Sequence, residues 1–61
     1  MATYTFSPTS LSTIVSHIEG LDMEIVSLSF VSGTYHLILN GEFDEEQYDH
    51  LRETTDLERQ V

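Results

Sequence analysis

Three histidines and eleven carboxylates are the side chains of this 61-residue sequence that could hold a metal ion or transfer protons. The histidines are His17, His36 and His50, and none has a second histidine or a cysteine three or four residues away. The acidic residues do not follow the alternating pattern of a calcium loop. We therefore predict no metal site and no cofactor.

No motif for covalent or phosphoryl-transfer chemistry is present either. The sequence has no glycine-rich phosphate loop, no nucleophile elbow and no cysteine. A chain of 61 residues also has little room for a pocket deep enough to exclude water from a substrate. We expect no catalytic residues and no enzymatic activity.

The charge of the chain is strongly one-sided. Eleven acidic residues against two arginines give a formal net charge of −9, and lysine is absent. We therefore expect no direct binding to nucleic acid, because no basic surface can neutralise its phosphates. Eight of the eleven acids lie from Glu42 onward. A helix there would place five of them opposite its apolar side, and they are the candidate partner-binding residues: Glu45, Glu46, Asp49, Glu53 and Asp56.

Two helices are expected to frame the chain. The first, over residues 8–19, has Ser7 as its cap and Pro8 in its first position, and Gly20 can end it in the left-handed conformation. The second, over residues 44–57, starts at Asp44, with a glutamine three residues later as in a capping box. Its apolar stripe is narrow, so we expect residues 56–61 to fray.

The segment between the helices predicts a β-hairpin of residues 23–32 and 34–40, joined by a turn at Ser32-Gly33. In that register the core face holds three cross-strand pairs: Phe30 with Tyr35, Leu28 with Leu37, and Val26 with Leu39. The opposite face offers a candidate dimer surface, which consists of Ile25, Val31, His36 and Ile38.

A further strand over residues 3–6 completes a β-α-β-β-α order. It predicts one domain over residues 1–61, an α+β two-layer sandwich with a three-stranded antiparallel or mixed sheet and two helices on one face. The arrangement resembles a ferredoxin-like fold that lacks its last strand, and such a resemblance carries no function.

Membrane insertion and secretion are not expected. No apolar run approaches the roughly 18 residues of a membrane span, and the N-terminus lacks a basic region followed by an apolar stretch. We predict a cytoplasmic location without a membrane partner. A domain this small without disulfides has little stability to spare, so we consider a homodimer plausible.

The favoured hypothesis is a non-enzymatic protein-interaction module whose second helix docks on a basic partner surface, for example on a nucleic-acid-binding protein that it blocks. Five carboxylates along that helix would be spaced by roughly 4 Å, close to the ~3.4 Å between phosphates of one DNA strand. By charge and size alone, the chain resembles small acidic inhibitors that mimic nucleic acid, such as viral anti-restriction and anti-CRISPR proteins.

The alternative is a self-associating structural or sensory domain, which dimerises through the candidate dimer surface or a free strand edge. Under this alternative the acidity reflects a high-salt habitat, since many acids and no lysine resemble the composition of proteins from extreme halophiles. The sequence leaves both hypotheses open.

Overall fold

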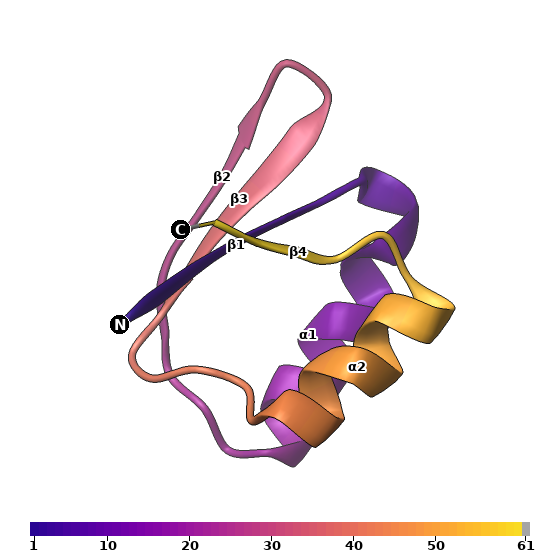
Figure 1. Cartoon of the computed structure of the whole chain (residues 1–61). Helices are drawn as coiled ribbons and strands as arrows, with labels where there is room; N and C mark the ends of the chain where they lie inside the picture. Colours follow the sequence, from indigo (N-terminus) through magenta and orange to yellow (C-terminus); the bar gives the residue numbers. More distant parts are fainter. Residues whose placement is uncertain (61) are drawn as a thin grey trace.

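The computed structural model describes residues 1–60, so the last residue of the predicted domain lies outside the described part. Its elements follow the order β-α-β-β-α-β (Figure 1). Strand β1 spans Ala2–Phe6, and a single 3-10 turn, η1 (Pro8–Ser10), leads into helix α1 (Leu11–Gly20).

The second half of the chain holds a hairpin, a helix and a short strand. The hairpin consists of strand β2 (Ile25–Val31) and strand β3 (Thr34–Leu39). Helix α2 (Glu45–Thr54) follows, and strand β4 (Glu58–Gln60) ends the described chain.

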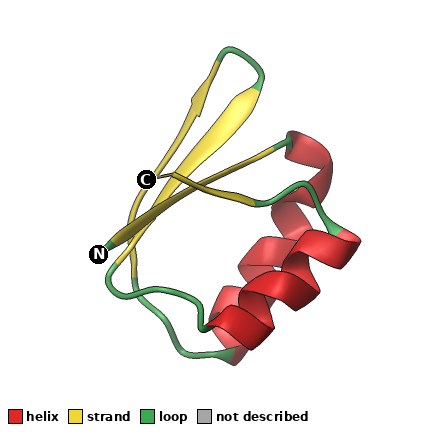
Figure 2. Ribbon diagram, viewed as in Figure 1, coloured by secondary structure: helices red, strands yellow, loops and turns green. Residues whose placement is uncertain are grey.

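The four strands form one antiparallel sheet in the order β2-β3-β1-β4. Both helices lie on the same face of this sheet, which gives two layers (Figure 2). The predicted α+β class with two helices is thus confirmed. The prediction of three strands is wrong, because residues 58–60, which we expected to fray, pair with β1.

The fourth strand exists because α2 ends three residues earlier than predicted. Thr55 adopts an extended conformation, with φ −140° and ψ 178°. Its hydroxyl donates to the carbonyl oxygen of Leu51 at 2.6 Å and accepts the N–H of Leu57 at 3.2 Å. These two bonds turn the chain off the helix axis and deliver Leu57 into the core, where it is 1% exposed.

Both ends of α1 differ from the prediction. Ser7 makes no side-chain cap, since its hydroxyl bonds to that of Thr9 at 2.8 Å instead. At the other end Gly20 stays helical, and the left-handed residue is Asp22, with φ 56°. The N–H of Met23 donates to the carbonyl oxygen of Ile18, which closes the helix in a Schellman-type end.

The start of α2 is confirmed as predicted. The carboxylate of Asp44 accepts the backbone N–H of Gln47 at 2.8 Å, so an acidic residue satisfies one of the free donors of the first turn. The helix then directs Leu51 into the core.

The hairpin register is confirmed from the turn to Ser27, which pairs with Ile38. Ser32 and Gly33 both have positive φ, 53° and 80°, as a two-residue primed turn requires. Beyond Ser27 an irregularity shifts the pairing, so that Leu39 lies opposite Ile25. The predicted pair of Val26 with Leu39 is therefore wrong, because a bulge sets two residues of β2 against one of β3.

The core lies between the helices and the two central strands. Its centre is Tyr4, whose ring centroid is 5.0 Å from that of Phe43 and 6.0 Å from that of Tyr48. The Tyr4 hydroxyl accepts the N–H of Phe43 at 3.0 Å, and burial raises the pKa of this hydroxyl. The buried apolar residues are Tyr4, Phe6, Ile14, Ile18, Leu37, Leu39, Phe43, Leu51 and Leu57.

Strand β2 contributes no buried residue to this core. Val26, Leu28 and Phe30, which we expected to be buried, are exposed. In Figure 1 the hairpin tip projects away from the two helices, so neither helix lies over the end of β2 next to the turn.

Candidate protein-interaction surfaces

Four of the five predicted acidic residues lie together on α2. Glu45, Glu46, Asp49 and Glu53 are all exposed, while Leu51 on the other side of the helix is buried. The four span about 12 Å of helix axis at ~1.5 Å per residue. We refer to these four residues as the acidic face of α2.

Asp56, the fifth predicted residue, does not belong to that face. It follows the end of α2, and its carboxylate accepts the backbone N–H of Ser7 at 3.1 Å and the hydroxyl of Ser10 at 2.8 Å. The hydrogen bond from the Ser7 backbone, and then that from the Ser10 hydroxyl, hold the pKa of Asp56 below its ordinary value. Asp56 therefore links the α2–β4 connection to the start of η1.

The two arginines of the chain share one aromatic ring. The guanidinium carbons of Arg52 and Arg59 lie 5.5 Å and 5.0 Å from the ring centroid of Tyr48, within the range of cation–π attraction. The backbone N–H of Arg59 also donates to the Tyr48 hydroxyl at 2.8 Å. Tyr48 thus fixes β4 against α2 and gathers both cations on that side of the helix.

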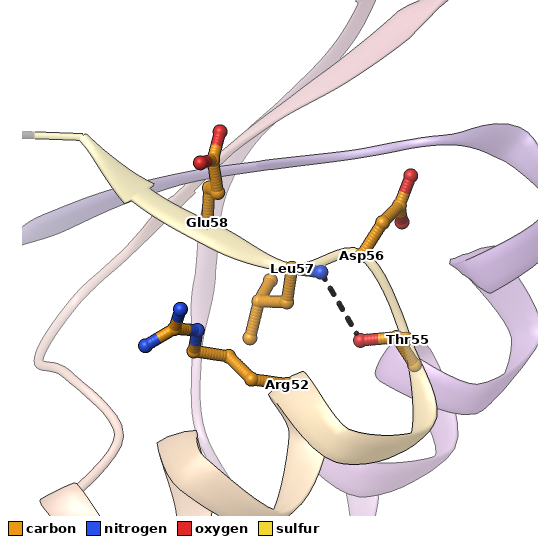
Figure 3. Close-up of a pocket in the computed structure, with 5 residues that line it drawn as sticks. All are labelled: Arg52, Thr55, Asp56, Leu57 and Glu58. Carbon is orange, nitrogen blue, oxygen red and sulfur yellow. Dashed lines mark hydrogen bonds between the residues drawn. The ribbon is translucent and has the colours of Figure 1, made fainter.

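A hollow of about 410 Å³ lies where α2 passes into β4, and it is open to solvent. Its lining includes Arg52 on the helix and Leu57 and Glu58 in the following segment (Figure 3). The carboxylate of Asp56 points away from the Arg52 guanidinium. An open hollow does not exclude water, so it lacks the desolvated surroundings that strengthen electrostatic catalysis.

Helix packing brings two of the three histidines together, which the sequence did not lead us to expect. The rings of His17 on α1 and His50 on α2 have centroids 5.9 Å apart. The third, His36, lies apart from this pair on β3. Within residues 1–60, no group of three or more histidine, cysteine or acidic side chains is placed to hold a metal ion.

Strand β2 forms a second exposed surface, in addition to the acidic face of α2. Among residues 1–60 it forms one edge of the sheet, so one side of its backbone has no neighbouring strand in the described part of the chain. All seven of its residues are exposed, and none is charged or proline. Its five large apolar side chains are 39–55% exposed: Ile25, Val26, Leu28, Phe30 and Val31.

The opposite edge of the sheet is different in kind. Strand β4 has only three residues, and two of them, Glu58 and Arg59, are charged. Short length and charge are the usual means by which a free edge is protected from pairing with another chain. Strand β2 has neither protection, so the two edges of the sheet are not equivalent.

The predicted dimer surface is only partly assembled. Val31 lies at the hairpin end, and His36 and Ile38 lie two residues apart on β3, on the same face of that strand. Both residues on β3 are half-buried. The bulge moves Ile25 opposite the buried Leu39 and away from that face. The exposed edge of β2 was not predicted as a whole, because its exposure depends on the strand order.

Comparison of this chain with protein-family models, with curated proteins and with solved structures finds no match. Across residues 1–60, no helix has both the length and the apolar character that crossing a membrane requires. The acidic face of α2 and the edge of β2 are the features from which a function can be argued.

Proposed function

We propose that this protein is a non-enzymatic interaction module that associates with a second copy of itself through strand β2. One observation carries the proposal: all seven residues of this edge strand are exposed, none is charged, and five of them carry large apolar side chains. Such an edge is a template for pairing with another chain, and proteins that stay monomeric usually blunt or cover it.

The charge distribution permits a second copy to pair with β2. A chain with net charge −9 repels its own copies, and this repulsion is weakest where the surface is uncharged. Tyr48 of α2 contacts Tyr4 of β1 and Arg59 of β4, so the acidic helix lies over the far side of the sheet. Three strand spacings of about 4.8 Å each, about 14 Å in all, separate β2 from β4. This distance exceeds the Debye length of about 8 Å at physiological salt.

The size of the core gives a second reason for association. Only nine apolar side chains are buried within the described chain, and no disulfide supports them. A domain of this size buries a smaller fraction of its surface on folding than a larger domain does, so its folding free energy is small. A dimer that covers the apolar side chains of β2 would increase the stability of the folded chain.

Sedimentation velocity tests this proposal with a matched pair of variants. Ser29→Lys places a charge in the middle of β2, and Ser12→Lys places the same charge on the exposed side of α1. We expect the wild type and Ser12→Lys to sediment as dimers at micromolar concentration, and Ser29→Lys to sediment as a folded monomer. A wild type that stays monomeric throughout this range contradicts the proposal.

A second candidate function is docking of the acidic face of α2 on a basic protein surface. It is supported by the exposure of all four carboxylates and by the position of Arg52 and Arg59, which both lie against the ring of Tyr48. The partner would be a nucleic-acid-binding protein, blocked by a surface that mimics the spacing of phosphates. Electrostatics of this kind mainly speed association and weaken as salt rises.

Charge reversal at equal net charge tests the second candidate. The double variant Asp49→Lys, Glu53→Lys changes the acidic face, and Glu19→Lys, Glu24→Lys makes the same change elsewhere on the exposed surface. With a lysine-rich peptide as probe, we expect the first pair to weaken binding more than the second at low salt. Equal losses of affinity in the two double variants would show that the peptide responds to the net charge of the protein and not to the acidic face of α2. That result would contradict this candidate function.

Adaptation to a saline habitat, the alternative explanation of the acidity, can be tested separately from both candidate functions. If the acids are an adaptation to a saline habitat, folding requires molar salt, and circular dichroism in dilute buffer would show an unfolded chain. A chain that folds in dilute buffer removes this explanation. The cytoplasmic location stays a prediction of the sequence.

We also propose that the topology is ferredoxin-like, with the last strand present. The β-α-β-β-α-β element order, the sheet order β2-β3-β1-β4 and the two helices on one face support this assignment. Proteins with this topology have many unrelated activities, so the topology does not help to choose between the candidate functions.

A further inference from the structure

The proposed self-association can be taken to residue level, and this step rests on that proposal. We infer that β2 pairs antiparallel with β2 of a second copy, about a two-fold axis that passes between the two Ser29 residues. The two four-stranded sheets then become one continuous sheet, in which the helices of both copies lie on the same face.

The bulge and the turn limit which residues can pair. Between the irregularity next to Ile25 and the turn at Ser32-Gly33, the regular part of β2 is Ser27–Val31. A two-fold antiparallel pairing that uses all of this segment must be centred on its middle residue. That residue is Ser29.

The side chains of this register match face by face, because residues directly opposite each other project from the same face of a sheet. Within the chain, Leu28 and Phe30 lie opposite Leu37 and Tyr35, on the face that carries the core. Across the axis, Leu28 would lie opposite Phe30 of the second copy on that face. Ser27 would lie opposite Val31 on the other face, whereas a slip of one residue in either direction would set Leu28 or Phe30 against a serine.

The backbone pattern agrees with the same register. Val31 and Thr34 flank a two-residue turn, and such flanking residues form a hydrogen-bonded pair. Because the pattern alternates along an antiparallel strand, the N–H and C=O groups of Leu28 and Phe30 point away from β3. In the inferred register these two residues oppose each other across the axis, so each pair can exchange both of its N–H···O bonds.

A line of aromatic rings leads from the core to this edge. The ring centroid of Phe6 on β1 lies 5.5 Å from that of Tyr35 on β3, which lies 4.9 Å from that of Phe30 on β2. The line ends at Phe30, which is 55% exposed. The second copy would continue it with Leu28 and cover part of the Phe30 ring.

Disulfide crosslinking tests the register, since the chain has no cysteine of its own. In the inferred dimer the two Ser29 residues form a non-hydrogen-bonded pair with a Cα separation of about 4.5 Å, which a disulfide can bridge. The matched control is Ser27→Cys, because two Ser27 residues would lie about 13 Å apart at ~3.3 Å per residue. We expect Ser29→Cys to form covalent dimers under mild oxidation at least about ten times faster than Ser27→Cys.

The other outcomes separate the register from the proposed function. A protein that sediments as a dimer while Ser27→Cys crosslinks as fast as Ser29→Cys would overturn the register and leave self-association standing. If an equal mixture of the two variants crosslinks faster than Ser29→Cys alone, the axis lies at Leu28 and the inferred register is wrong. A protein that sediments as a monomer and gives no crosslink overturns both.

Discussion

The hydroxyl of Ser10 donates a 2.8 Å hydrogen bond to the carboxylate of Asp56, which follows it by 46 residues in the chain. The same carboxylate accepts the backbone N–H of Ser7. Asp56 therefore accepts one backbone N–H just before η1 and the hydroxyl of the last residue of η1. It ties the segment after α2 to the beginning of the first helix.

Replacing Asp56 with asparagine is expected to lower the free energy of unfolding at pH 7 by about 1 kcal/mol, because its hydrogen bonds with Ser7 and Ser10 lose the charge of the acceptor. The folded pKa of Asp56 lies below its ordinary value. Its stabilisation is therefore present above the unfolded pKa of about 3.9 and is lost as pH falls through the lower folded pKa.

Urea unfolding at pH 7 and at pH 2–3 measures this effect. The difference between wild type and Asp56→Asn should shrink at the lower pH. Asp49→Asn, on the exposed acidic face of α2, serves as the control and should change the free energy of unfolding by less than about 0.5 kcal/mol. A difference that is the same at both pH values would mean that the Asp56 carboxylate does not act through its charge.

Tyr4→Phe is expected to destabilise the fold by about 1–3 kcal/mol, because the buried N–H of Phe43 loses the hydroxyl oxygen that it donates to. Tyr35→Phe removes a hydroxyl from a half-buried tyrosine and should have a smaller effect. Thermal unfolding of both variants checks this, and equal destabilisation by the two would contradict the assigned role of the Tyr4 hydroxyl.

Leu57→Ala is expected to cost about 2–5 kcal/mol, the usual range for truncating a fully buried leucine. Leu57 lies in the core although it follows the end of α2. Chemical denaturation measures the loss. A loss below about 0.5 kcal/mol, typical of surface positions, would show that the segment after α2 is not packed as described.

The features that could be predicted correctly from the sequence are those set by residues close together in the chain. Asp44 and Gln47 are three residues apart, and their cap was predicted. The turn at Ser32-Gly33 and the hairpin register up to Ser27 depend on a short stretch of chain, and they were predicted as well.

Features that depend on distant parts of the chain were missed. Strand β4 is Glu-Arg-Gln, which has no apolar alternation, and only its pairing with β1 makes it a strand. The role of Asp56 requires Ser7 and Ser10 to come near, from the other end of the chain. The exposure of Leu28 and Phe30 follows from the edge position of β2, which no local pattern reveals.

Leu28→Ser is expected to weaken self-association about tenfold or more, corresponding to ~1.4 kcal/mol or more. The Leu28 side chain is already 39% exposed in a single chain, so the folding of the monomer should change much less. Dilution followed by size analysis measures the first effect, and circular dichroism measures the second. Unfolding of the variant without any change in dimer dissociation would place Leu28 in the core instead of at an interface.

Amide hydrogen exchange at Leu28 and Phe30, followed by NMR over a range of protein concentrations, tests the central claim most directly. In a single chain these two N–H groups face solvent at the free edge of β2, and in the dimer they are hydrogen-bonded to the second copy. We predict that both amides are protected at high concentration and lose protection on dilution, while the amides of β1 remain protected. Rapid exchange of both amides at every concentration would contradict the claim that β2 binds another strand.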